Sequence, residues 1–571
     1  MSLSSSQTQT QTSSDPTQII IIIIIIGSFI HSISKDKIEF IKDNGLMIIG
    51  PNKKIICFQS ASTPWTQSLL KEKLKSSFND LPPHSSLRFI KLKRGEFILP
   101  GFIDTHTHAV QYSNHGLGQQ YQLLDWLQNI TFPEENKFHD LLYAQRILHK
   151  VVQRLLAVGT TTSCYYTSIH LGAAKILANL CHQLGQRAFI GRCNMDKNQT
   201  FNQYKEDSPQ KSIQDSKDLI NYIRSHFNNN NNHLHQTQNL THSKIIHPNL
   251  KLTSSYHSYN SINSSTSSLV KPILTPRFAL SCSEELMSLL GQMIKQDPQL
   301  YLQTHLSESI SEIELTKSSF PNDLTYTAIY DRFGLLTPRT ILAHCVHLDQ
   351  SEINLLIQRQ CGLSHCPTSN FNIRSGICQV LKLLNSGIHK IGLGTDISAG
   401  YGIGILSAIR NASAAAKALN FGSKNSLDSQ TSHLSIQNLL YLATLGGAKV
   451  CGLDDRIGNF QVGKEFDALL IQTGAYSGEL IQSDSSMLQS KIQSNQSNPS
   501  DKISAEYEFL DINSQVYHQG TNPNFFIDEQ NTQVDLDELL EKFLFTGDDR
   551  NIGTVFVNSR VVGGARPLKL F

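Results

Sequence analysis

Alternation of strand-like and helix-like stretches between residues 97 and 420 is the feature that most constrains the fold of this chain. A short apolar run ends in polar residues, a helical pattern follows, and the order then repeats. Eight such strands can be read, namely FILPGFIDTHTH, GTTTSCYY, QRAFIGRCNMD, VKPILTPRF, LYLQTHLSE, TILAHCVHL, CGLSHCPTSN and HKIGLGTD. Eight consecutive βα units predict an α/β protein with a parallel (β/α)8 barrel, as in the TIM barrel, over residues 97–456.

The two flanks have a different pattern. Residues 19–96 and 457–571 contain short strand-like runs, among them KIICFQS, DALLIQT and GTVFVNSRVV. We expect both flanks to form one small β-sandwich, with the barrel inserted within it. The run Ile19–Ile26 is too short for a membrane span, which needs about 20 apolar residues, and lacks the basic start of a signal peptide. Because branched residues favour strands, we interpret it as the opening strand.

Three segments of biased composition carry no sustained apolar period. Residues 1–18 are rich in Ser, Thr and Gln, residues 228–268 in Asn, Ser and His, and residues 476–502 in Ser and Gln. Such compositions predict disorder or poor order. The second segment joins a helix to the next strand, so we expect it at the N-terminal face of the barrel, away from the catalytic loops.

Composition narrows the class of partner. The net charge of +2 gives no sign of a nucleic-acid or membrane-surface binder, and 39% hydrophobic residues are ordinary for a soluble globular protein. Ten cysteines without a CxxC motif argue against a disulfide framework or a zinc knuckle and favour a cytoplasmic protein. The expected partner is a small molecule, with neither nucleic acid nor membrane involved.

A His-x-His pair, His106 and His108, ends the first predicted strand. With 22 histidines in 571 residues, chance alone supplies about 0.8 such pairs, so spacing by itself decides nothing. The other pair, His233 and His235, falls in the Asn-rich segment. Position is more informative, because the carboxyl ends of barrel strands form one rim. The polar residues expected on that rim are His106, His108, Arg277, His305, His344 and Asp396.

These residues suit a metal site. Side chains two apart on a strand point the same way, with Cα atoms about 6.6 Å apart, so His106 and His108 can share one ion. His305 and Asp396 would complete the ligands and leave a place for water. Nitrogen and oxygen ligands suit zinc, while iron and manganese stay compatible with them. A bound cation lowers the pKa of its water toward about 7, which predicts hydrolysis by the resulting hydroxide.

Three residues are candidate catalysts. Glu308, three residues after His305, can take a proton from the water and deliver it to a ring nitrogen or leaving amine. Asp396 can help to deprotonate the water, and His344 can polarise the scissile centre or hold the hydroxide. The alternative for each residue is a place in a buried hydrogen-bonded network at the barrel mouth.

The ordered set of His106, His108, His305, His344 and Asp396 resembles the mononuclear branch of the amidohydrolase superfamily. More specifically, PGFIDTHTHAVQYS, LLDWLQNITFPEE, TPRFALSCSEELM, THLSES, AHCVHL, HCPTSN and GLGTD resemble the guanine deaminase family. The resemblance runs from about Ile24 to the closing GDDRNIGTVFVNSRVV, interrupted mainly by the biased segments.

This resemblance implies hydrolytic deamination of guanine to xanthine and ammonia in purine catabolism, by a homodimer with one Zn²⁺ per subunit. Metal-hydroxide attack at C2 would use Glu308 as the proton shuttle. The implied metal ligands are His106, His108, His305 and Asp396. The predicted substrate-binding residues are His108, Gln111, Arg277, Phe278, His305, Glu308 and Asp396. Arg277 and Gln111 match the acceptors and donors of guanine, and Phe278 offers an apolar wall.

Other functions stay open at this point. A deaminase or dechlorinase of the same superfamily, acting on a triazine or an adenosine-like ring, would share the metal site and differ in the base-reading residues. A catalytically dead scaffold, as in the collapsin response mediator proteins, would lack ligands that are all present here. The cytidine-deaminase zinc fold is excluded because its H-x-E and P-C-x-x-C signature is missing.

Overall fold

The computed structural model describes residues 20–78, 85–198, 201–227, 268–421, 433–473, 522, 524–525 and 535–570. The biased segments 1–18, 228–268 and 476–502 lie outside these ranges, apart from residue 268. Among the helices of the described ranges, none combines the length and the hydrophobicity that crossing a bilayer requires.

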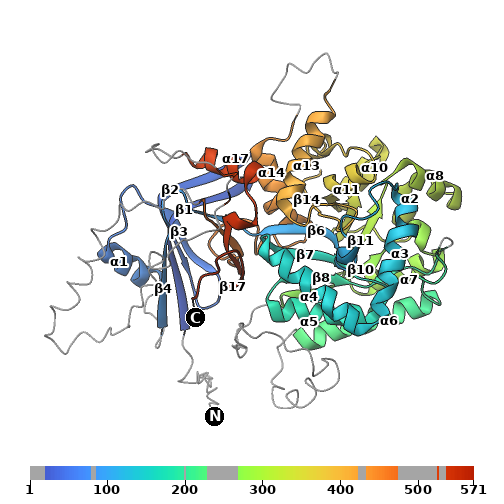
Figure 1. Cartoon of the computed structure of the whole chain (residues 1–571), viewed down its shortest axis with the longest axis horizontal. Helices are drawn as coiled ribbons and strands as arrows, with labels where there is room; N and C mark the ends of the chain where they lie inside the picture. The colour runs from blue at the N-terminus through green and yellow to red at the C-terminus, as the bar shows by residue number, and fades with distance from the viewer. Residues whose placement is uncertain are drawn as a thin grey trace, which may run out of the picture.

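Eight parallel strands close into the predicted barrel, shown at the right of Figure 1. Each strand pairs with the next along the chain, and the ring closes where the eighth pairs with the first. The barrel strands are β6 (Phe102–His108), β7 (Thr160–Tyr166), β8 (Arg187–Gly191), β10 (Val270–Pro276), β11 (Tyr301–Leu306), β12 (Thr340–His344), β13 (Gly362–His365) and β14 (Ile391–Leu393). The short β9 (Cys193–Asn194) extends the pairing of β10.

Helices surround the barrel, as the alternating pattern predicts. They are α4 (Leu141–Ala157), α5 (Leu171–Leu184), α6 (Pro209–Phe227), α7 (Glu284–Gln296), α8 (Ile310–Ser319), α9 (Tyr326–Arg332), α10 (Gln350–Arg359), α11 (Pro367–Asn372), α12 (Val380–Asn385), α13 (Ile405–Ala418), α14 (Ile436–Ala443) and α15 (Leu445–Val450). Their ends follow local chemistry. At α10, the Asp349 side chain accepts from Glu352 N, and the Glu352 side chain accepts from Asp349 N, which together form a capping box.

Both flanks contribute to one mixed sheet at the left of Figure 1. Its strands are β1 (Ile20–Ser34), β2 (Lys37–Ile49), β3 (Ile55–Ser60), β4 (Ser85–Lys91), β5 (Phe97–Pro100), β15 (Ala468–Ile471), β16 (Ile552–Val557) and β17 (Arg560–Gly563). The flanks also contain α1 (Gln67–Phe78), α17 (Leu536–Thr546) and the 3-10 turn η6 (Asp549–Asn551). Strands from both chain ends therefore build one β-structure, as predicted, and the expected β-sandwich takes the form of a single mixed sheet.

The isoleucine run forms the first half of β1, as predicted, over its described part, Ile20–Ile26. Its two faces enter different cores. Ile23 and Ile25 pack in a cluster with residues of β2, β15 and β16, whereas Ile22 and Ile24 pack in a cluster that includes Leu74 of α1. Because both faces are buried, the strand is continuously apolar instead of alternating.

The chain crosses from the sheet to the barrel at Gly101, between β5 and β6. A Cβ at this position would lie 2.1 Å from Thr161 Oγ1, so a larger residue would force the neighbouring strand away. Residues 97–100 pair with β1 and β15 of the flank sheet. The crossing therefore lies a few residues beyond the boundary expected at residue 97.

Loops at the carboxyl ends of the barrel strands carry short helical turns. The first and longest contains η1 (Ala109–Asn114), α2 (Leu123–Trp126), the π-turn η2 (Leu127–Thr131), α3 (Phe132–Asn136) and η3 (Lys137–His139), and the loop after β10 contains η4 (Ala279–Ser281). These segments stand over the barrel mouth and supply part of the site described next.

Candidate metal centre and substrate cavity

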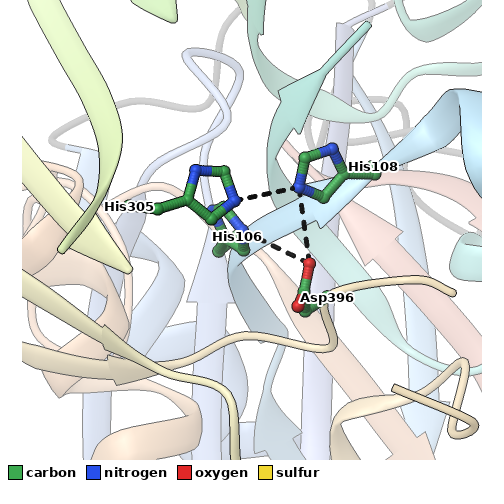
Figure 2. A group of neighbouring side chains, drawn as sticks. All are labelled: His106, His108, His305 and Asp396. Atoms are coloured by element: carbon green, nitrogen blue, oxygen red, sulfur yellow. Dashed lines mark hydrogen bonds and ion pairs between the residues drawn. The ribbon is translucent and has the colours of Figure 1, made fainter. Parts of the chain in front are cut away.

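Three imidazoles and one carboxylate meet at the barrel mouth. His106 and His108 end β6, His305 lies on β11, and Asp396 follows β14 by three residues. One ligand atom from each lies within 4.8 Å of the others, and all four residues are buried. Figure 2 shows the side chains converging: His108 Nε2 is 3.3 Å from His305 Nε2 and 3.4 Å from Asp396 Oδ1, and His106 Nε2 is 3.4 Å from the same oxygen.

Hydrogen bonds on the far side of two rings orient their nitrogens. His106 Nδ1 donates to Gln303 Oε1 at 2.8 Å, and His305 Nδ1 donates to the Arg277 carbonyl at 2.5 Å. Each oxygen can only accept, so the proton sits on Nδ1 and the lone pair of Nε2 faces the centre. His106 Nε2 is buried and has no hydrogen-bond partner among the described residues. These atoms fit a divalent cation.

Electrostatics favour the same protonation states. Burial holds the pKa of His108 and of His305 well below the ordinary histidine value, and neighbouring imidazoles lower that of His305 further. Burial alone would raise the pKa of Asp396, but its interactions with the nearby imidazoles of His106 and His344 hold that pKa well below its usual range. Neutral imidazoles and an ionised carboxylate are the forms that bind metals.

Glu308 lies just beyond β11, next to the four-residue group. Its Oε1 accepts from Ser375 Oγ at 3.1 Å, and its Oε2 lies 3.4 Å from His344 Nε2. Burial raises the pKa of Glu308 to about 7, although the nearby His344 works in the opposite direction. A carboxyl group with this pKa can both take and give a proton near neutral pH.

His344, the last residue of β12, faces two carboxylates. Its Nε2 is 3.7 Å from Asp396 Oδ2, and its Nδ1 donates to Asn370 Oδ1 at 2.8 Å. Burial lowers the pKa of His344, but the charges of Glu308 and Asp396 outweigh burial and raise it. The ring therefore bridges the carboxylates of Glu308 and Asp396.

Backbone strain gathers at these strand ends. His344 and Asp396 have φ of 70° and 47°, in the left-handed region that non-glycine residues rarely adopt. The Asp396 amide donates to the His106 carbonyl at 3.0 Å, and its own carbonyl accepts from Gly400 N at 2.7 Å. Such strain costs about 1–3 kcal/mol per residue and is found where surrounding structure fixes a functional side chain.

A cavity opens on the group. Its lining includes His108, Gln111, Leu123, Trp126, Leu127, Arg277, Phe278, His305, Glu308, Ile373, Asp396 and Ala399. Every substrate-binding residue predicted from the sequence is in this lining. Trp126 also faces the cavity, and its Nε1 has no partner among the described residues.

Hydrogen bonds fix the orientation of the two polar side chains that are candidates for binding the base. Arg277 follows β10 directly and pairs with Glu135, with NH1 2.8 Å from Oε2 and NH2 3.1 Å from Oε1. Gln111, in η1, donates to the same carboxylate at 2.8 Å and accepts from Ser398 N at 3.1 Å. The sequence-based reasoning missed Glu135, Gln303, Asn370 and Ser375. Only the acidic pair in FPEE, within a block that resembles the family, signalled the first of these.

Comparison with known proteins fits this geometry. A model of the amidohydrolase family matches residues 97–562, so the chain belongs to the amidohydrolase family. A probable guanine deaminase of Schizosaccharomyces pombe is 36% identical over 539 residues, covering 94% of this chain and 83% of that protein. The guanine deaminase of Homo sapiens is 34% identical over 94% of this chain and 95% of its own. Within the family, the chain therefore belongs to the guanine deaminases, hydrolases that act on C–N bonds.

A solved structure agrees. The guanine deaminase from C. acetobutylicum, with guanine bound in its active site, superposes with a TM-score of 0.68 at 29% identity, covering 95% of this chain and 99% of that one. The expected fold is thereby confirmed over nearly the whole described chain.

Proposed function

We propose that this protein hydrolyses guanine to xanthine and ammonia in purine catabolism, with one Zn²⁺ per subunit as its cofactor. The observation that carries the proposal is the single cavity that joins the metal-ligand group to Gln111, Arg277 and Phe278. The relatives named above support the same substrate. In a deaminase for a base without the paired O6 and N7 acceptors of guanine, these donors would lack matching acceptors on the substrate.

His106, His108, His305 and Asp396 would hold the zinc ion, since all four offer nitrogen or oxygen atoms and no thiolate belongs to their group. A bound zinc ion supplies Lewis acidity that lowers the pKa of water to about 7. The other groups of the site then act on protons and on the purine.

Glu308 would be the proton shuttle. With a pKa of about 7, its carboxylate can accept a proton from water and return it as the amino group at C2 leaves as ammonia. Ser375 holds Oε1, which leaves Oε2 on the side of His344. His344 would polarise the reacting centre from Nε2, while Asn370 fixes its ring through Nδ1.

Recognition of the base would use the opposite part of the cavity. Arg277 can donate to the O6 and N7 acceptors of guanine, and the amide of Gln111 can pair with its donor and acceptor edge. Phe278 and Trp126 supply flat apolar surfaces. His108, His305, Glu308 and Asp396 would contact the reacting side of the ring.

We also propose a homodimer in the cytoplasm. The homodimer rests on the family resemblance. All ten cysteines lie in described ranges and are buried free thiols, which suits a reducing compartment.

The test is turnover of guanine by purified protein, with xanthine and ammonia both quantified. We expect equal amounts of the two products, loss of activity after chelation, and recovery with about one equivalent of Zn²⁺ per chain. Full turnover by metal-free protein would contradict the proposed metal role, and absence of turnover by zinc-loaded protein would contradict the proposed activity.

A further inference from the structure

One buried carboxylate organises the base-reading side of the cavity. Glu135 lies on α3 and has 0% exposure. It accepts four hydrogen bonds: two from Arg277 at 2.8 and 3.1 Å, one from Gln111 Nε2 at 2.8 Å and one from Tyr204 Oη at 2.6 Å. Four bonds match the acceptor capacity of an ionised carboxylate. Glu135 itself does not line the cavity, whereas Arg277 and Gln111 do.

The pairing with Glu135 fixes the direction of the Arg277 donors. The guanidinium is planar, and two of its nitrogens are engaged on one carboxylate, so the plane and the remaining N–H directions are set together. The group also lies over the Phe132 ring, 5.1 Å from its centroid. Because Arg277 is 3% exposed, its charge needs a buried counter-charge, and Glu135 supplies it.

Glu135 fixes the Gln111 amide as well. The Ser398 amide can only donate, so Gln111 Oε1 faces it, and Nε2 is left to donate to Glu135. If the amide were flipped, Nε2 would face the Ser398 amide, donor against donor, and Oε1 would face the Glu135 carboxylate, acceptor against acceptor. One Nε2 hydrogen is occupied in this way, and the second has a defined direction.

We infer that Glu135 is a positioning residue for purine specificity: it aims Arg277 and Gln111 at the 6-oxo side of the base. It also neutralises Arg277, so that the cavity accepts an uncharged lactam instead of an anion. The inference rests on the proposed function, because it assigns Arg277 to the acceptors of guanine. Glu135 would thus help to determine which purine binds, although it lies outside the cavity wall.

The test compares Glu135→Gln with Glu134→Gln. Glu134 precedes Glu135 on the same helix, but its carboxylate accepts from Ser113, Tyr143 and Lys137 and has no bond to Arg277. Binding of hypoxanthine and of purine to each zinc-loaded variant is measured by calorimetry. Hypoxanthine carries the 6-oxo group without the 2-amino group, so it binds without deamination. Purine lacks both groups.

We expect Glu135→Gln to weaken hypoxanthine binding at least about tenfold, since charge-assisted hydrogen bonds lose their orientation, and to change purine binding less than about threefold. Glu134→Gln should leave both within about twofold, with metal content equal to wild type in all variants. If Glu135→Gln weakens the binding of both ligands equally, or weakens the binding of neither, the inference is overturned. If Glu135→Gln does not fold, Glu135→Asp is measured in the same way, with the same two decisive outcomes.

Guanine turnover by the wild type separates this inference from the proposed function. If the wild type does not deaminate guanine, the proposed activity fails, while the comparison of hypoxanthine with purine still decides the role of Glu135. If the wild type is active and the two ligands respond alike to Glu135→Gln, only the positioning role fails.

Discussion

The backbone carbonyl of Arg277 accepts a hydrogen bond from Nδ1 of His305 at 2.5 Å. One residue thus orients a metal-ligand imidazole with its backbone and faces the substrate cavity with its side chain. Backbone and side chain can therefore be separated by mutation, because a substitution at position 277 retains the carbonyl.

Arg277→Lys should separate base recognition from metal binding. Lysine keeps the charge but loses the planar fork that pairs with Glu135. We expect KM for guanine to rise about tenfold or more, with metal content unchanged because the carbonyl still holds His305. Steady-state kinetics and metal analysis check this. Loss of metal from the variant would show that the guanidinium supports the ligand group.

Glu308→Gln should disable proton transfer while the site stays assembled. The amide keeps the shape of the side chain but cannot accept a proton from water, so kcat should fall by about 10²–10⁴-fold. Zinc content should equal that of the wild type, since Glu308 does not belong to the four-ligand group. His305→Gln is the contrasting variant, and it should lose zinc together with activity. Loss of zinc from Glu308→Gln would make Glu308 a ligand instead.

The acidic limb of the pH profile should report Glu308. Burial raises the pKa of this carboxyl to about 7, and only its deprotonated form can accept a proton, so kcat/KM should fall as pH drops below about 7. Ser375 donates to Glu308 and lowers its pKa. Ser375→Ala should therefore move the limb to higher pH. If the acidic limb does not move in this variant, the limb reports the titration of a group other than Glu308.

The Asn-rich segment should be dispensable for chemistry. It leaves α6 at Phe227 and rejoins the described chain at residue 268, just before β10 begins at Val270. Arg277 follows the other end of β10, so the segment attaches at the barrel face away from the cavity. Replacing residues 229–266 with a short Gly/Ser linker should leave kcat/KM within about twofold. A folded deletion variant with a selective loss of turnover would contradict this placement.

Much of the fold could be predicted because its signals are periodic. Eight strand-like runs alternate with helical patterns, and the structure confirms all eight barrel strands. Helix α1 was not predicted, since it is short and buries only Leu74 among its side chains. The strand built from the isoleucine run was predicted, but the two cores on its faces were visible only after the partners of β1 were known.

The residues of the candidate site could likewise be predicted only in part. His106, His108, His305, His344 and Asp396 could be gathered in advance because strand ends share one rim. Glu135 could not, because it lies on a short helix after an irregular turn and its partner Arg277 is 142 residues away. Gln303 on β11 holds the imidazole of His106 on β6, and Asn370 on α11 holds that of His344 on β12; no sequence spacing links either partner to its histidine.

The most direct test of the account is a substrate panel on purified protein with measured zinc content. Guanine, adenine, cytosine, adenosine and a chlorotriazine are compared by release of ammonia or chloride. We predict turnover of guanine, with kcat/KM at least about 10³-fold above that for every other compound, because none of the others carries the adjacent O6 and N7 acceptors that Arg277 is proposed to meet. Preferred turnover of adenosine, cytosine or the triazine, or equal turnover of guanine and adenine, would contradict it.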